Sequence, residues 1–177
     1  MSDLGLGYVH IYTGNGKGKT TAALGLALRA AGRGLKTIMV QFMKGQFYGE
    51  LEAVKPLAGL IAIEQYGHPR FCRFTDPPDD ADVQRANAAM ARLHAILAAP
   101  SCDILIADEA VTAMMFNLVS EDDLMRLISA KPRTLELVLT GRGATPRLIE
   151  AADLVTEMQD IKHYYTQGIQ ARLGIEH

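Results

Sequence analysis

The sequence has few of the features that mark secreted, membrane or nucleic-acid-binding proteins. Its 177 residues include two cysteines, Cys72 and Cys102, without the paired spacing of a zinc site or a disulfide framework. No apolar stretch approaches the roughly 20 residues that a transmembrane helix needs, and the segment "MSDLGLGYVH" lacks the basic start and apolar run of a signal peptide. The formal net charge of −2 gives no electrostatic case for nucleic acid. These absences predict a cytoplasmic protein that binds neither a membrane nor nucleic acid.

The pattern of apolar residues predicts an α/β fold in a single domain that spans residues 1–177. Short β-rich runs alternate with helical patterns, and several of these runs are almost continuously apolar, as in strands covered on both faces. This alternation predicts a mostly parallel central sheet of about six strands flanked by helices. The expected strands cover residues 8–13, 36–42, 60–66, 103–108, 134–140 and, more weakly, 154–159.

The expected helices carry start and stop signals. The first begins after Gly18 and is stopped by "GRG" at residues 32–34. Acidic residues at 79 and 80 start the second, and "SEDDLMRLISAKP" opens the third with a capping serine and an acidic first turn. The least regular stretch is "GHPRFCRFTDPPDD", residues 67–80, a loop long enough to suggest a functional role.

The segment "YTGNGKGKTTAALG", residues 12–25, predicts a phosphate-binding loop. Glycines at three alternate positions can let backbone N–H groups turn inward as an anion nest. Lys19 can reach phosphate oxygens, and Thr20 can ligate Mg²⁺ at the positive end of the following helix. The residues expected to contact the nucleotide are Gly14, Asn15, Gly16, Lys17, Gly18, Lys19, Thr20 and Thr21.

The spacing of this loop departs from the common pattern G-x-x-x-x-G-K-[ST], which would place a glycine where Thr13 stands. The alternative is a glycine-rich turn between strand and helix with incidental lysines. The strand before the loop and the helix after it favour the phosphate loop, and the expected fold is therefore P-loop NTPase-like.

The segment "DILIADEA" places two adjacent acids, Asp108 and Glu109, at the end of an apolar strand. It resembles a Walker B segment, which brings carboxylate near Mg²⁺ at the carboxyl edge of the sheet. Adjacent residues on a strand point in opposite directions, so we expect one acid to serve the metal and the other a neighbouring group. A solvated strand tip is the alternative.

Two further cations follow expected strands. Lys44 in "VQFMKG" and Arg142 in "LTGRG" both stand where a side chain could reach a phosphate at the same sheet edge. For each of them the alternative is a solvated surface residue.

Taken together, these stretches resemble the ATP:corrinoid adenosyltransferases of the cobalamin pathway, in their phosphate-loop family. The resemblance spans nearly the whole chain. It rests on "YTGNGKGKTTAA", "VQFMKG" with the following Gly49 and Glu50, "ADEA", "LTGRG", and the tail "DIKHYYTQGIQARLGIE", which contains Lys162 and His163.

The resemblance implies a transfer in which a Co(I) corrinoid attacks the 5′ carbon of ATP and expels triphosphate. It implies Lys19, Thr20 and Glu109 as catalytic residues, and Thr20, Asp108 and Glu109 around Mg²⁺. It also implies that Lys44, Arg142, Lys162 and His163 bind the substrates, that ATP lies reversed relative to common P-loop ATPases, that the protein is a homodimer, and that a reductase or flavoprotein supplies the electron. Positioning and leaving-group stabilisation are then the protein's tasks, because Co(I) needs no general base.

The chain departs from the family pattern at two places. Only seven residues precede Tyr8, where family members often carry a helical extension, and the chain has no tryptophan for the corrin-facing loop. Phe71 and Phe74 are the aromatic candidates in that loop, either beneath the corrin or merely as loop anchors. The rival functions are a P-loop ATPase or kinase and an ATP-binding regulatory module.

Overall fold

The central feature of the fold is a six-stranded sheet in which every strand pair is parallel. The structure is a computed structural model and describes residues 5–69 and 78–176. The strand order is β3-β2-β4-β5-β1-β6. The bounds are β1 Val9–Thr13, β2 Thr37–Phe42, β3 Ile61–Tyr66, β4 Ile104–Asp108, β5 Glu136–Thr140 and β6 Leu154–Glu157. The predicted fold class is confirmed, and the weak sixth strand exists but ends at residue 157.

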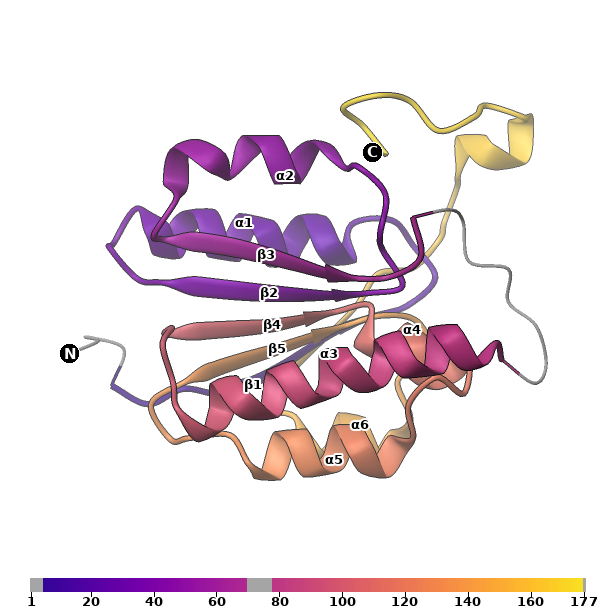
Figure 1. Ribbon diagram of the computed structural model, residues 1–177. Helices are drawn as coiled ribbons and strands as arrows, with labels where there is room; N and C mark the ends of the chain where they lie inside the picture. The colour runs from indigo at the N-terminus through magenta and orange to yellow at the C-terminus, as the bar shows by residue number, and fades with distance from the viewer. Residues whose placement is uncertain (1–4, 70–77, 177) are drawn as a thin grey trace.

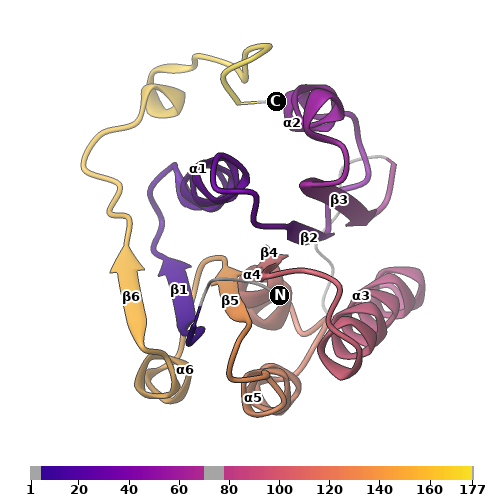
Figure 2. The ribbon, with the colours of Figure 1, turned by 90° about the vertical axis from the view of Figure 1, so that its left-hand side faces the viewer.

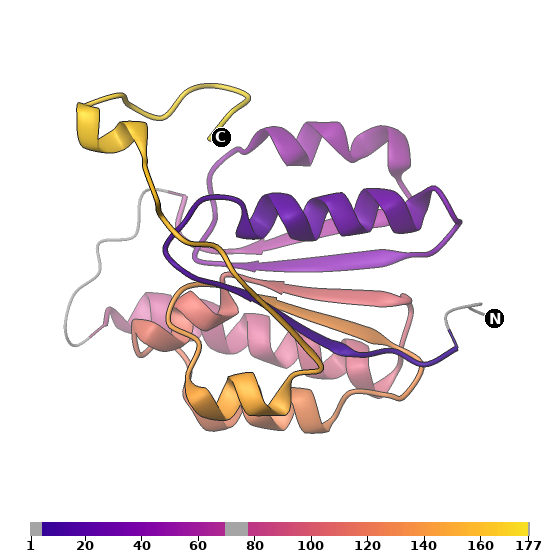
Figure 3. The same ribbon diagram turned by 180° about the vertical axis from the view of Figure 1, so that it is seen from behind.

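Helices cover both faces of the sheet (Figures 1 and 2). One face carries α1 Lys19–Ala31, α2 Gly49–Ala53 and the short 3₁₀ turn Lys55–Leu57. The other carries α3 Asp80–Ala98, α4 Ala110–Met115, α5 Glu121–Ser129 and α6 Pro146–Ala151. The chain after β6 crosses to the α1 side and carries a second 3₁₀ turn, Tyr164–Gln167 (Figure 3).

The predicted helix signals are confirmed. Asp79 caps α3 by accepting from the Ala81 amide at 2.8 Å, and Ser120 forms a reciprocal capping box with Asp123 at the start of α5. The first helix ends at Ala31, directly before "GRG". In the part of the chain that the structure describes, no helix combines the length and apolar character needed to cross a membrane.

The core is split by the sheet into two apolar clusters. On one side, alanines of α1 pack on the strands, and Ala23 and Ala27 have no exposed surface. Because alanine is small, α1 lies close to the sheet, and its first turn stands directly beside the strand ends. The larger cluster on the other face joins the strands to α3, α4 and α5.

The strand order brings four loops to one edge of the sheet. In parallel strands all carboxyl ends lie at the same edge, so the segments after β1, β2, β4 and β5 open there together. The register places Gln41 of β2 beside Asp108 of β4 and beside Gln65 of β3. A row of polar side chains therefore runs across three strands at this edge.

Candidate functional site

The loop between β1 and α1 needs glycine for close packing as well as for backbone conformation. Gly14 and Gly18 have φ of 94° and 118°, in the region that glycine favours. A Cβ on Gly14 would lie 2.4 Å from the Met158 carbonyl oxygen, and one on Gly16 would lie 2.6 Å from that of Gln159. The Gly16 amide donates to Met158 O at 2.6 Å, so this N–H is held by the chain after β6 rather than turned into the loop.

Lys19 bridges the phosphate loop. Its Nζ donates to the carbonyl oxygens of Gly14 at 2.7 Å and Gly16 at 2.8 Å, and only 7% of the residue is exposed. Burial lowers the pKa of Lys19, while the nearby Glu109 carboxylate opposes that shift. Neutral carbonyl groups of the loop thus hold the Lys19 ammonium. An anionic ligand can take their place as its hydrogen-bond acceptor.

Asp108 is the centre of the polar row. It has no exposed surface, and its carboxylate accepts four hydrogen bonds. Oδ1 accepts from the hydroxyls of Thr20 at 2.8 Å and Thr140 at 2.7 Å. Oδ2 accepts from Lys44 Nζ at 2.9 Å and Gln41 Nε2 at 3.2 Å. A buried carboxylate is stable only when it is paired and hydrogen-bonded, and here α1, β5, β2 and the loop after β2 supply the partners.

Glu109 turns away from this row at the first residue after β4. Its φ of 60° is unusual for a residue other than glycine and places it at the start of α4. The Glu109 amide donates to Thr140 Oγ1 at 2.9 Å, and its carboxylate accepts from the Thr112 hydroxyl. The two acids therefore serve different surroundings: Asp108 is enclosed, and Glu109 lines the cavity above it.

The loop after β5 packs on the start of α4. Gly141 has φ of 142°, and a Cβ there would lie 2.3 Å from the Thr112 amide nitrogen. The Arg142 amide donates to Thr112 Oγ1 at 2.9 Å. This close packing brings Arg142 to the wall of the same cavity.

Lys44 is held by a tight turn after β2. Met43 has φ of 61°, and the Lys44 amide bonds back to Phe42 O at 2.7 Å. The loop after β3 packs against this turn so closely that a Cβ on Gly67 would lie 2.3 Å from the Met43 carbonyl carbon. Burial alone would lower the pKa of Lys44, but the carboxylates of Asp108, Glu109 and Glu50 raise it. Lys44 is therefore a firmly charged ammonium.

A cavity of about 1030 Å³ joins these parts. Its walls come from the phosphate loop, α2, the loops after β2, β4 and β5, and the carboxy-terminal tail. The predicted residues that line it are Asn15, Gly16, Lys17, Gly18, Lys19, Thr20, Thr21, Lys44, Glu109, Arg142 and His163. Three predicted residues do not line it: Gly14 supplies a carbonyl to Lys19, Asp108 lies beneath the wall, and Lys162 is exposed. Phe71 and Phe74 lie outside the described residues.

Around Asp108 and Lys44, four residues of the site were not predicted from the sequence. Gln41 and Thr140 are donors to Asp108, Tyr48 lies 5.2 Å from the Lys44 ammonium, and Glu50 accepts from Gln41 at 3.2 Å. A signal existed for two of them, since Gln41 and Thr140 are polar residues that follow the apolar stretches of β2 and β5. Glu50 belongs to the motif that carried the resemblance, although no role was predicted for it.

The tail folds onto the cavity through contacts of its own. His163 Nδ1 accepts from the Tyr165 amide at 3.1 Å and so starts the 3₁₀ turn. The Glu176 carboxylate accepts from Tyr164 and from Arg172, and these bonds lower the pKa of Glu176 to about 2. His163, Tyr165 and Glu176 all reach the cavity wall.

The oxygen donors fit a magnesium ion shared with phosphate. Across residues 5–69 and 78–176 there is no cluster of three or more His, Cys, Asp or Glu side chains that could hold a metal alone. Mg²⁺ bound to nucleotides characteristically takes one or two protein oxygens, with phosphates and water as the remaining ligands. Thr20 Oγ1 and Asp108 Oδ1 lie 2.8 Å apart, and the Lys44 ammonium already contacts both residues as a cation.

The fold belongs to the P-loop NTPase-like class. The structure is similar to a KaiC-like protein from Pyrococcus horikoshii, with a TM-score of 0.56 and 16% identity over 88% of this chain and 74% of that one. It is also similar to the flagellar accessory protein FlaH from Methanocaldococcus jannaschii, with a TM-score of 0.59 and 14% identity over 87% and 72% of the two chains. At this identity the likeness concerns the fold.

Sequence comparison identifies the family within this class. Residues 6–177 match the family described as ATP:corrinoid adenosyltransferase BtuR/CobO/CobP, and the chain belongs to it. A corrinoid adenosyltransferase from Pseudomonas aeruginosa is 36% identical over 96% of this chain and 83% of its own length. One from Escherichia coli K12 is 32% identical over 97% and 86%. The resemblance drawn from the motifs is confirmed, and the protein is a transferase.

Proposed function

We propose that this protein transfers the 5′-deoxyadenosyl group of ATP to the cobalt of a reduced Co(I) corrinoid and releases triphosphate. Family membership supports this reaction over hydrolysis or simple nucleotide binding. The structural observation that carries the proposal is the composition of one cavity. The cationic phosphate loop, the acidic end of β4 and the tail with His163 all line it, so a polyphosphate and a second substrate can share it.

The reaction is a nucleophilic substitution at carbon. The cobalt electron pair forms the cobalt–carbon bond, the bond between C5′ and its oxygen breaks, and that oxygen keeps the bonding pair as part of triphosphate. Cobalt passes formally from Co(I) to alkyl-Co(III). No proton must be removed from the nucleophile. Both acids at the end of β4 are engaged in hydrogen bonds, Asp108 with four donors and Glu109 with Thr112, which fits a site without a water-activating base.

The chain's own task is to bind the triphosphate and hold it in place as it leaves. Lys17, Lys19 and Arg142 bring positive charge to the cavity wall and stabilise the negative charge that grows on the leaving oxygen. Thr20 and Asp108 would hold Mg²⁺, with Glu109 beside them, and the ion supplies further neutralisation of phosphate charge when bound. We further propose the reversed orientation of ATP, with its γ-phosphate deep in the loop.

The products separate this function from its rivals. The protein is incubated anaerobically with ATP, Mg²⁺ and chemically reduced cobalamin while the spectrum is followed for alkylcobalt. We expect adenosylcobalamin and intact triphosphate in equal amounts. ADP and phosphate without alkylcobalt would identify an ATPase, and bound but unchanged ATP would identify a regulatory module; either result contradicts the proposal.

The aromatic residues of the 67–80 loop carry a separate proposal from the sequence. We propose that Phe71 or Phe74 packs beneath the corrin and replaces its lower ligand, because an aromatic ring excludes water and offers no donor atom. Phe71→Ala and Phe74→Ala should then slow adenosylation started from Co(II) more than adenosylation of pre-reduced Co(I). Equal losses in the two assays would assign the residues to loop anchoring.

The setting of the reaction completes the proposal. We propose a cytoplasmic homodimer of one-domain chains, with a reductase or flavoprotein as electron donor. The sparse cysteines support the cytoplasmic setting, and the family resemblance supports the dimer and the electron donor. Sedimentation of the purified protein tests the dimer. Reconstitution with a flavoprotein and Co(II) cobalamin, in place of the chemical reductant, tests the electron donor.

A further inference from the structure

Lys44 occupies a position between the residues that the proposed magnesium ion needs. Its Nζ lies 2.9 Å from Asp108 Oδ2 and 3.3 Å from Thr20 Oγ1. Asp108 is fully buried and the Lys44 side chain is 15% exposed, so this is an enclosed ion pair rather than a surface contact. The ammonium thus neutralises a buried carboxylate that would otherwise be costly to enclose.

A second acid lies close by. Glu50 Oε1 is 3.9 Å from the same ammonium, and it is held by Gln41 Nε2 at 3.2 Å. Gln41 also donates to Asp108, and Gln65 of β3 donates to Gln41 Oε1 at 3.0 Å. One amide, that of Gln41, therefore holds both acids within reach of Lys44, and the Tyr48 ring lies 5.2 Å from the ammonium.

We propose that Lys44 is a displaceable cation: it holds Asp108 and Thr20 until Mg²⁺ arrives, then passes to Glu50. This inference rests on the magnesium site of the proposed function. A divalent ion and an ammonium cannot both contact the same carboxylate and hydroxyl without strong repulsion. The lysine stem is long and flexible, Glu50 is already near, and the aromatic ring offers a further cation contact along the path.

The exchange gives Lys44 a positioning role. Before metal binding, the ammonium keeps the carboxylate and hydroxyl in the arrangement that the metal needs. After exchange, the pair with Glu50 ties the loop after β2 to α2, the element that walls the cavity beside the phosphate loop. Metal binding is thereby coupled to the position of that wall.

The first test measures metal binding without nucleotide or corrinoid. Mn²⁺ is titrated into the protein and its free concentration followed by electron paramagnetic resonance. Lys44→Met should bind Mn²⁺ at least tenfold more tightly than the parent, and Asp108→Asn in the same background should abolish the gain. Lys17→Met is the matched control, because Lys17 lines the cavity but makes no hydrogen bond or ion pair with the described residues. Its gain should be threefold or less.

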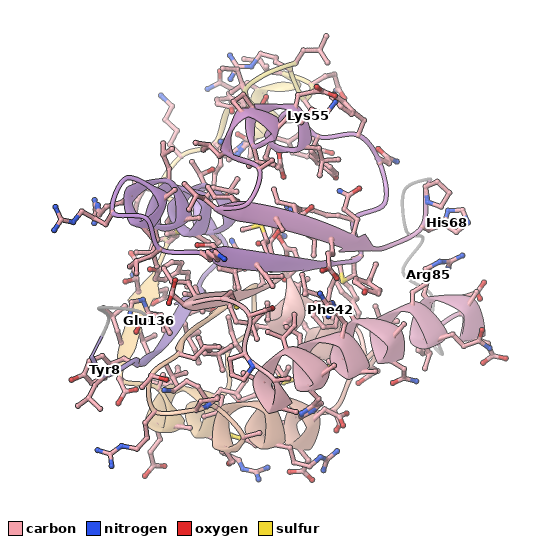
Figure 4. The ribbon with its side chains drawn as sticks, turned by 60° about the vertical axis from the view of Figure 1, so that its left-hand side comes forward. Tyr8, Phe42, Lys55, His68, Arg85 and Glu136 are labelled. Atoms are coloured by element: carbon pink, nitrogen blue, oxygen red, sulfur yellow. The ribbon has the colours of Figure 1, made fainter. Side chains whose placement is uncertain are left out.

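The second test needs no variant and follows the departure of the Lys44 ammonium from Asp108. Brief acetylation followed by mass spectrometry reports the reactivity of each lysine. Saturating Mg²⁺ should raise the reactivity of Lys44 severalfold, because its ammonium leaves a buried carboxylate. Lys55, an exposed residue beyond α2 in a surface pair with Glu52, should not change (Figure 4).

A double-mutant cycle tests whether the Lys44 ammonium passes to Glu50. Glu50→Gln should weaken Mn²⁺ binding severalfold in the parent and leave it nearly unchanged in Lys44→Met, since Glu50 then has no ammonium to receive. A purely electrostatic effect of Glu50 on the metal would persist in both backgrounds and would overturn the transfer to Glu50.

The outcomes distinguish a failure of the Lys44 exchange from a failure of the magnesium site. Mn²⁺ binding that depends on Asp108, together with unchanged Lys44 reactivity or a gain no larger than that of Lys17→Met, would overturn the exchange and leave the magnesium site standing. No Asp108-dependent binding in any variant, even with inorganic triphosphate added, would overturn the magnesium site and the exchange together.

Discussion

Two carboxylates at opposite edges of the sheet show how similar chemistry can serve different ends. Asp108 ends β4 at the carboxyl edge, and Glu136 begins β5 at the amino edge, beside Tyr8 (Figure 4). Glu136 accepts from the Tyr8 amide at 2.7 Å and pairs with His10 Nε2 at 2.6 Å. Both acids are thus well satisfied, so hydrogen bonding alone does not identify a functional carboxylate.

The difference lies in where the partners come from. Those of Glu136 come from β1 and from Tyr8 directly before it, and they tie β1 to β5 locally. Those of Asp108 come from α1, β2, β5 and the loop after β2, and one of them is a lysine that reaches the cavity. Substitutions at the carboxyl edge should therefore change turnover, and those at the amino edge should change only stability.

The largest effect should come from Lys19→Ala. The variant loses an ammonium at the phosphate loop, and the loss of one preorganised charged contact costs on the order of 3 kcal/mol in a transition state, roughly a hundredfold in rate. Initial rates are measured at saturating ATP with pre-reduced corrinoid, and Lys55→Ala is the control. Turnover close to that of the parent would contradict a catalytic phosphate loop.

Asp108→Asn should lower both stability and metal response. Its amide group would face donors on every side, and it would leave Lys44 without its buried partner, a loss on the order of 3 kcal/mol in unfolding free energy. Urea unfolding gives the first quantity, and a Mg²⁺ titration of the rate gives the second. A variant that unfolds and titrates with Mg²⁺ like the parent would show that Asp108 has no more influence than a surface acid.

Glu109→Gln, at the same edge of the sheet, should change turnover while leaving the free energy of unfolding almost unchanged. Glutamine keeps the shape and can still accept from Thr112, so unfolding should change by less than about 1 kcal/mol. The loss of charge beside the proposed metal should raise the Mg²⁺ concentration for half-maximal rate or lower the rate itself. If neither the Mg²⁺ dependence nor the rate changes, Glu109 has no role at the metal.

The smallest effect is expected for Glu136→Gln, and it should depend on pH. Burial raises the pKa of Glu136, but the bonds from His10 and the Tyr8 amide outweigh it, so the pKa is lowered from 4.5 in the folded protein. The charged form therefore stabilises the fold fully above pH 4.5, and this contribution disappears as the pH falls through the lower folded value.

Thermal melts at two pH values check this expectation. The variant should melt a few degrees below the parent at pH 7, the difference should be smaller at pH 3, and turnover at pH 7 should be unchanged. The stability difference should be about 1 kcal/mol or less, since the pair is partly exposed. A difference that persists undiminished at pH 3, or a loss of turnover, would remove the contrast between the two edges.

Much of this molecule was predictable from local patterns. The apolar runs located the strands, the alanine-rich stretch after Gly18 located α1, and the capping residues Asp79 and Ser120 marked where α3 and α5 begin. The phosphate loop was predictable because its glycines, lysines and threonines are contiguous in the chain. These features depend on neighbours in sequence, so one stretch carries the whole signal.

The rest depended on which strands lie side by side. No local pattern states that β4 lies between β2 and β5, yet that order brings Gln41 and Thr140 to Asp108. The glycines of the loop also had a second reason that only packing shows: Gly14 and Gly16 make room for the chain after β6. The sequence by itself determined the strands, the helices α1, α3 and α5, and the glycine-rich loop between β1 and α1, because backbone propensity and hydrophobic periodicity are local. The tertiary structure alone decided the partners of Asp108 and the place of Lys44, because contacts between distant strands arise only when the sheet is assembled.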